Sequence, residues 1–93
     1  MIKITVKFMS IARQRAGAGV VEFTSPESKL RDVLNAIVAS YRIADLILTE
    51  KGEVRPWARV LVNGRCHEFV GGLDTELQSG DRIALIYPYA ENF

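Results

Sequence analysis

The sequence predicts an α+β domain in which one helix packs across one face of a small mixed sheet. Segments with the alternating pattern of β-strands lie towards both ends of the chain, and one long segment with helical periodicity lies between them. The chain has 93 residues, of which 48% are hydrophobic and 25% are charged, values typical of a single globular domain. We therefore expect one domain over residues 1–93.

The first two strands are predicted to form an antiparallel hairpin. Apolar and polar residues alternate in MIKITVKF, so Ile4, Val6 and Phe8 share one face of a half-buried strand. Residues 10–19 end in a glycine-containing stretch and are predicted to be a wide loop with room for a helical turn. The segment VVEFT, residues 20–24, is the second strand.

The segment from Lys29 to Tyr41 is predicted to be the main helix. Its apolar residues recur at helical spacing and form one stripe towards the core: Leu30, Val33, Leu34, Ile37, Val38 and Tyr41. Ser28 is a candidate N-cap, and Ser25-Pro26 is an alternative start. We expect a further apolar turn within residues 42–49, and the composition of EKGEVRP predicts a turn after it.

The second half of the chain is predicted to supply the remaining strands. WARVLVNG is the third strand, closed by the turn signal Asn63-Gly64, and CHEFV is a short fourth strand. GGLDTELQSGD is a loop with one helical turn over Asp74–Leu77, and RIALIY is the last strand. This order of elements is that of the β-grasp arrangement, the architecture of ubiquitin, with a mixed sheet of four to five strands.

The alternation in the last strand predicts which of its side chains face solvent. Arg82 marks the solvent side, so Ile83 and Leu85 face the helix and Ile86 points outward. The same reasoning points Leu61 outward from the third strand. Single exposed apolar residues are normal on protein surfaces. A contiguous patch made by Leu61 and Ile86 would instead indicate a docking surface.

Neither a catalytic site nor a metal site is predicted. Cys66 and His67 are adjacent, but neighbours on a strand point to opposite faces, so we interpret them as a small hydrophobic residue beside a surface imidazole. One cysteine and one histidine also fall short of the three or four ligands of a zinc site. Asp74 is interpreted as the cap of a helical turn.

Other polar and aromatic residues have ordinary interpretations. Arg13 and Arg15 are taken as solvated, and Trp57 as either a partner anchor or part of the core. A net charge of +1 and a pI of about 7.9 give no reason to expect nucleic acid as a partner. No apolar run is long enough to cross a membrane, and a single cysteine excludes an internal disulfide, so we expect a cytoplasmic protein.

Residues 50–90 resemble the MoaD/ThiS family of ubiquitin-like sulfur carriers. The matching motifs are Val62-Asn63-Gly64, Leu73-Asp74-Thr75, Leu77 and Gly80-Asp81, followed by a strand that runs into Pro88. The resemblance implies a carrier rather than an enzyme, without a cofactor. It also implies a protein partner, of the type of the molybdopterin synthase large subunit or of an adenylating enzyme. The partner-docking residues expected on this basis are Leu61, Ile86, Pro88 and Tyr89.

The chain departs from the family pattern in its tail, Ala90, Glu91, Asn92 and Phe93. The carriers of this family end in Gly-Gly, and a partner enzyme adenylates the terminal carboxylate before sulfur converts it to a thiocarboxylate. Alignment on Gly80-Asp81 and Pro88 puts those glycines at Glu91 and Asn92, whose side chains would clash in a channel that admits only glycine.

Two functions remain open on this evidence. The first is a relative of the sulfur carriers of molybdopterin biosynthesis that is not itself thiocarboxylated, because Glu91-Asn92-Phe93 replaces the Gly-Gly end. The second is a non-carrier interaction or regulatory module that keeps the docking face and has lost the chemistry.

Overall fold

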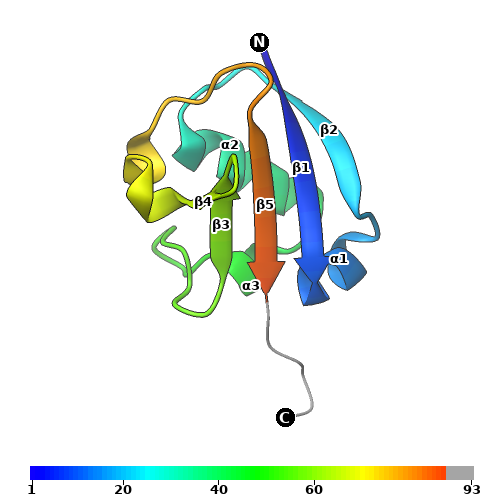
Figure 1. Ribbon diagram of the computed structural model, residues 1–93. Coiled ribbons are helices and arrows are strands. Elements are labelled where there is room, and N and C mark those ends of the chain that lie inside the picture. Colours follow the sequence, from blue (N-terminus) through cyan, green and yellow to red (C-terminus); the bar gives the residue numbers. More distant parts are fainter. Residues whose placement is uncertain (88–93) are drawn as a thin grey trace.

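Five strands form one mixed sheet in the order β2-β1-β5-β3-β4 (Figure 1). The computed structural model describes residues 1–87. The strands are β1 (Ile2–Ser10), β2 (Val20–Ser25), β3 (Arg59–Val62), β4 (Arg65–Cys66) and β5 (Arg82–Tyr87). β1 pairs antiparallel with β2 and parallel with β5, and β3 pairs antiparallel with both β5 and β4. The predicted hairpin and the predicted last strand are therefore confirmed.

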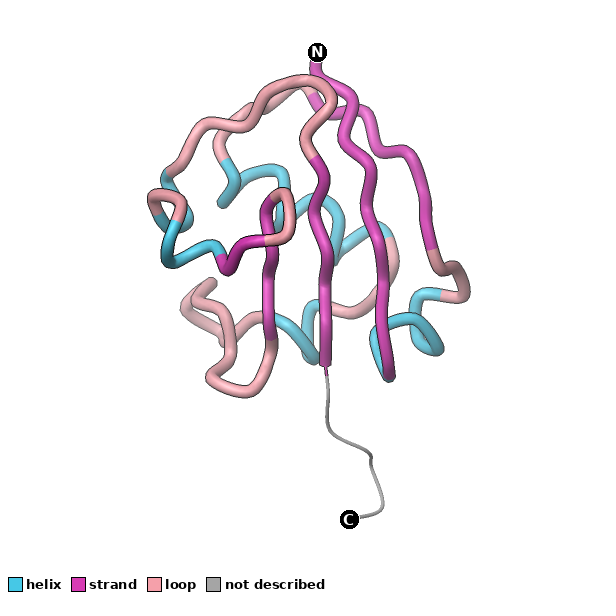
Figure 2. Tube along the Cα trace, in the orientation of Figure 1, coloured by secondary structure: helices cyan, strands magenta, loops and turns pink. Residues whose placement is uncertain are grey.

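The helix α2 (Leu30–Ser40) packs across one face of the sheet and forms the core with it. Five residues of the predicted stripe are at most 1% exposed: Leu30, Val33, Leu34, Ile37 and Val38. Tyr41, just beyond the helix, is half-buried, and its ring centroid lies 4.9 Å from that of Phe8 on β1. Figure 1 shows α2 behind β1 and β5, and in Figure 2 no helical segment of residues 1–87 passes in front of these two strands.

Two short helices lie near the C-terminal ends of β1 and β5 (Figure 1). α1 (Ile11–Ala16) occupies the loop between β1 and β2, where the sequence left room for a helical turn. α3 (Ala44–Ile47) is the apolar turn expected after the main helix, and it buries Leu46 and Ile47. No helix within residues 1–87 is long and apolar enough to cross a lipid bilayer.

The start of α2 differs from the prediction. Lys29 occupies the N-cap position and no side chain caps the helix, so neither Ser28 nor Ser25-Pro26 begins it. The backbone N–H of Leu30 donates instead to the carbonyl oxygen of Thr75, at 2.9 Å. A distant loop thus satisfies a donor that a capping side chain normally takes, and a local sequence pattern cannot reveal such a partner.

The segment after β3 also differs from the prediction. Asn63 and Gly64 both have positive φ, 52° and 85°, and form the predicted tight turn. Of the strand predicted over CHEFV only Cys66 pairs with β3; the observed strand begins at Arg65, and the chain winds into the 3₁₀ helix η1 (His67–Phe69) after Cys66. A second 3₁₀ turn, η2 (Gly72–Asp74), takes the place of the turn predicted over Asp74–Leu77.

Candidate partner-binding site

The side of the sheet that faces away from α2 is called the open face here. The side chains on it alternate along each strand with those of the core. The open face consists of Lys3, Thr5, Lys7 and Met9 on β1, Val20, Glu22 and Thr24 on β2, Arg59 and Leu61 on β3, Cys66 on β4, and Arg82, Ala84 and Ile86 on β5.

The pairing registers arrange the middle of the open face in rows. Met9, Ile86 and Arg59 lie side by side in one row across β1, β5 and β3. Lys7, Ala84 and Leu61 lie in the next row. The apolar members of the two rows, Met9, Leu61, Ala84 and Ile86, form a continuous group, which is called the apolar centre below.

The structure brings Leu61 and Ile86 together in this apolar centre. Leu61 lies opposite Ala84 and Ile86 lies opposite Arg59, so Leu61 and Ile86 are diagonal neighbours across β3 and β5. Both are half-buried, and neither packs against the core cluster, in contrast to Tyr87. Contact of these two residues with a partner stays a prediction.

The apolar centre adjoins the end of β5. Ile86 precedes Tyr87, the last residue that the structure describes, and Ser10 at the end of β1 pairs with Tyr87. The other expected docking residues, Pro88 and Tyr89, and the tail residues Ala90, Glu91, Asn92 and Phe93, lie outside the described residues. Any partner that binds the apolar centre is therefore held beside the start of the tail.

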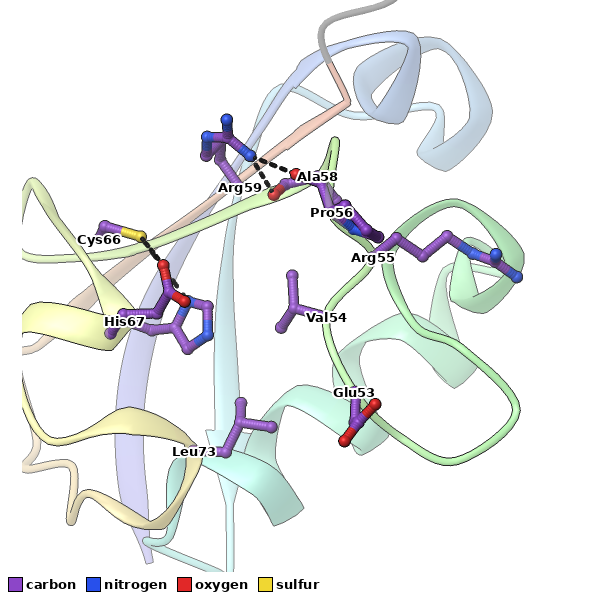
Figure 3. Close-up of a pocket in the computed structure, with 10 residues that line it drawn as sticks. Glu53, Val54, Arg55, Pro56, Ala58, Arg59, Cys66, His67 and Leu73 are labelled. Carbon is purple, nitrogen blue, oxygen red and sulfur yellow. Dashed lines mark hydrogen bonds between the residues drawn. The ribbon is translucent and has the colours of Figure 1, made fainter.

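Cys66 pairs with Leu61 across β3 and β4, and with His67 it lines a hollow of about 300 Å³ between the segment that leads into β3 and the segment that follows β4 (Figure 3). The prediction that they point to opposite faces is wrong, because β4 ends at Cys66 and η1 begins at His67. The Cys66 Sγ atom lies 3.9 Å from His67 Nδ1 and donates to Glu68 Oε1 at 3.7 Å. Both distances are longer than the roughly 2.6–3.2 Å that separates a nucleophile from its base in a hydrogen-bonded pair.

The remaining candidates have structural roles. Asp74 does not cap a helical turn; its carboxylate accepts a hydrogen bond from Arg31 Nε at 3.3 Å. Arg15 pairs with Asp45 at 3.0 Å and so joins α1 to α3, whereas it was expected to be solvated. Trp57 is 37% exposed and is not core filling. No group of three or more metal-ligating side chains occurs within residues 1–87.

Sequence reasoning missed part of the open face. The first strand was expected to end at Phe8, so the position of Met9 beside Ile86 was not foreseen. Lys7 was assigned to the strand, but its row with Ala84 and Leu61 depends on the register between strands that are far apart in sequence. Only the pairing of β1 with β5, which leaves no local signal, reveals these neighbours.

Comparison with known proteins identifies the family of this chain. A family model described as the ThiS family matches residues 6–90. The chain belongs to the ThiS family. This assignment and the likeness to solved ubiquitin-like structures confirm the β-grasp fold and the resemblance to the ubiquitin-like sulfur carriers.

Individual members and solved structures agree with the ThiS family assignment. Small archaeal modifier protein 3 of Haloferax volcanii is 29% identical over 90 residues, which are 96% of this chain and 98% of that protein. A candidate subunit 1 of a molybdopterin converting factor from Pyrococcus furiosus is 26% identical. The match covers 96% of this chain and all of that one, with a TM-score of 0.74. Small archaeal modifier protein 1 of H. volcanii shares the fold, with 22% identity, a TM-score of 0.79 and coverage of 96% of this chain and 100% of that one.

Proposed function

We propose that this chain is a partner-binding relative of the sulfur carriers of molybdopterin biosynthesis. Its partner is the large subunit of molybdopterin synthase or an adenylating enzyme, and it binds through the open face. The observation that carries the proposal is the diagonal pair Leu61 and Ile86, which lies on the open face at the end of β5 that leads into residue 88. The similarity to a candidate molybdopterin converting factor subunit supports the pathway.

The open face suits binding because its residues are already in place. The apolar centre lies on β1, β3 and β5, which are paired with one another, so little backbone ordering is required on association. Half-buried apolar side chains on such strands lose water when a partner covers them, and this desolvation is favourable. The open face thus gives the chain affinity for its partner and fixes where the partner binds. We propose that the chain acts by binding and not as an enzyme. We place this role in the cytoplasm, as the composition predicts.

We further propose that the chain is not itself thiocarboxylated. Glu91 and Asn92 carry side chains at the positions where the carriers have glycine. The charge of Glu91 would also enter a closed site that holds an anionic nucleotide, and desolvating an unpaired charge costs several kcal/mol. Docking is therefore proposed to occur without activation.

A second candidate function follows from the same contrast between a suitable face and an unsuitable tail. The chain would then be a regulatory module that occupies the adenylating enzyme and excludes the true carrier. Competition distinguishes this function: a regulatory module lowers adenylation of a Gly-Gly carrier when it is added in excess. A chain that binds only the large subunit of molybdopterin synthase leaves that adenylation unchanged.

The test of the proposed function is binding to the purified cognate adenylating enzyme and to the purified large subunit, measured by titration calorimetry. We expect the unmodified chain to bind one of them. The double variant Leu61→Asp, Ile86→Asp should keep its fold by circular dichroism and lose binding. The control is Phe69→Asp, which places the same charge at an apolar side chain that is 76% exposed and outside the open face.

Two results would contradict the proposal. Binding by the double variant at the unmodified affinity would show that the apolar centre is not the docking site. Global unfolding of the double variant, with Phe69→Asp still folded, would show that Leu61 and Ile86 serve the core instead.

A further inference from the structure

We infer that the surface which fits the open face is a protein surface whose apolar middle is bordered by carboxylates. This inference rests on the proposed function, since it specifies the partner of the same face. Four cations and one carboxylate point from the open face into solvent: Lys3, Lys7, Arg59, Arg82 and Glu22. They give this face a formal charge of +3, while the whole chain carries only +1.

The cations border the apolar centre directly. Arg59 lies opposite Ile86, and Lys7 lies opposite Ala84. Arg82 precedes Ala84 on the same side of β5 and lies opposite Thr5. Each row of the apolar centre therefore ends in, or adjoins, a positive side chain, which is the arrangement of an interface with an apolar middle and a charged rim.

The chain does not neutralise these cations within residues 1–87. The ion pairs found there are Arg15–Asp45 and Arg31–Asp74, and neither pair lies on the open face. The Arg59 guanidinium donates to the carbonyl oxygens of Pro56 and Ala58, which satisfies donors but does not cancel the charge. Uncompensated charges of one sign raise the local potential and attract a surface of opposite sign.

The composition of the open face favours a protein partner over a nucleic acid. Single-stranded nucleic acids bind to platforms of aromatic side chains, and the residues that define the open face include no aromatic ring. Duplexes require a long row of cations along the phosphate backbone, whereas these four cations surround apolar side chains. Carboxylates on a protein complement such a rim, and its apolar middle covers Leu61 and Ile86.

The inference predicts a salt-dependent association. Charges at the rim of an interface steer the encounter of two proteins and act mainly on the rate of association. Salt screens exposed charges: the Debye length is about 8 Å at an ionic strength of about 0.15 M and becomes shorter as salt is added. Binding should therefore weaken as salt is added, while the contribution of the apolar centre remains.

The test uses short peptides, so it does not depend on the cognate partners. One peptide has a leucine-rich middle flanked by glutamates, and a second has the same middle flanked by lysines. An oligouridylate serves as the nucleic-acid control. Binding is followed by the backbone amide signals of the isotope-labelled chain. We expect the glutamate-flanked peptide alone to shift amides of β1, β3 and β5, with a weaker effect at high salt.

Two charge reversals locate the effect. Lys7→Glu lies on the open face, and Lys51→Glu lies in the exposed turn between α3 and β3; each lowers the net charge from +1 to −1. We expect Lys7→Glu to weaken binding of the glutamate-flanked peptide about fivefold or more at low salt, and Lys51→Glu to change it by less than about twofold. Arg82→Glu serves in place of Lys7→Glu if the latter does not unfold cooperatively.

Each outcome decides the question. Equal binding of the two flanked peptides, equal effects of the two reversals, or no shift on β1, β3 and β5 would overturn the inference. Stronger binding of the oligouridylate would replace it with a nucleic-acid surface. Failure of both cognate proteins to bind, with the glutamate-flanked peptide bound as expected, would contradict the proposed function. The inference that the partner surface is bordered by carboxylates would still be supported.

Discussion

Asn63 and Arg82 bond to each other twice across the boundary between the β3–β4 turn and β5. The backbone N–H of Asn63 donates to the carbonyl oxygen of Arg82 at 2.8 Å, and the Asn63 side-chain oxygen accepts from the backbone N–H of Arg82 at 2.9 Å. The Asn63 amide nitrogen also donates to Asp81 Oδ1 at 3.1 Å. One asparagine thus fixes where β5 begins relative to β3.

The first prediction separates the two contributions of Asn63. Asn63→Gly removes the side-chain bonds and should lower the free energy of unfolding by about 1–3 kcal/mol, because each hydrogen bond contributes about 0.5–1.5 kcal/mol. Asn63→Ala should cost about 1–2 kcal/mol more, because alanine at a φ of 52° is strained and glycine is not. Urea unfolding measures both. An alanine variant as stable as the glycine variant would show that the turn is not held at positive φ.

The second prediction concerns the core beneath α2. Leu34 is 1% exposed, so Leu34→Ala should lower the free energy of unfolding by about 2–5 kcal/mol, through lost burial and the cavity left behind. Asn35→Ala, on the exposed side of the same helix, is the control and should change stability by at most about 0.5 kcal/mol. Urea unfolding of the two variants checks this. Similar costs for both would mean that α2 presents a different face to the sheet.

The third prediction concerns activation of the tail. A protein made as residues 1–93 should not support ATP–pyrophosphate exchange by the cognate adenylating enzyme. A variant with Glu91→Gly and Asn92→Gly that lacks Phe93 should support it. Phe93 adds about 3.3–3.6 Å of chain beyond the two altered positions, which exceeds the tolerance of a reactive geometry.

The binding assay serves as the control for this exchange experiment. Both forms must bind the enzyme through the open face for the comparison to be informative. Equal exchange rates for the two forms would restore the carrier function. Exchange by the variant alone would trace the lost activity to the last three residues.

The sequence correctly predicted the elements whose periodic pattern extends over many residues of a single segment. The stripe of α2 and the alternation of β5 correctly separated core from solvent, because each pattern is set by burial on one side of one element. The turn at Asn63-Gly64 was also correct, since positive φ at both positions strongly favours that pair of residues.

The errors occur where distant segments decide the local structure. Ser28 failed as an N-cap because Thr75 supplies the bond to Leu30 from another part of the chain. Of the strand expected over CHEFV only Cys66 pairs with β3, since the chain winds into η1 from His67 onward. Leu61 and Ile86 were assigned to the open face from alternation within each strand. Identifying the cations that lie beside them required the register of β1, β5 and β3.

The parallel pairing of β1 with β5 also sets when the domain can fold. Residues 5–10 have their partners at residues 82–87, so the two central strands come from distant parts of the chain. Contacts between such distant segments slow folding, because a long loop must close before they form. During synthesis on the ribosome, β1 lacks one of its two neighbours until Tyr87 has emerged. Until then β1 exposes an unpaired strand edge, and such an edge can pair with another chain unless a chaperone covers it.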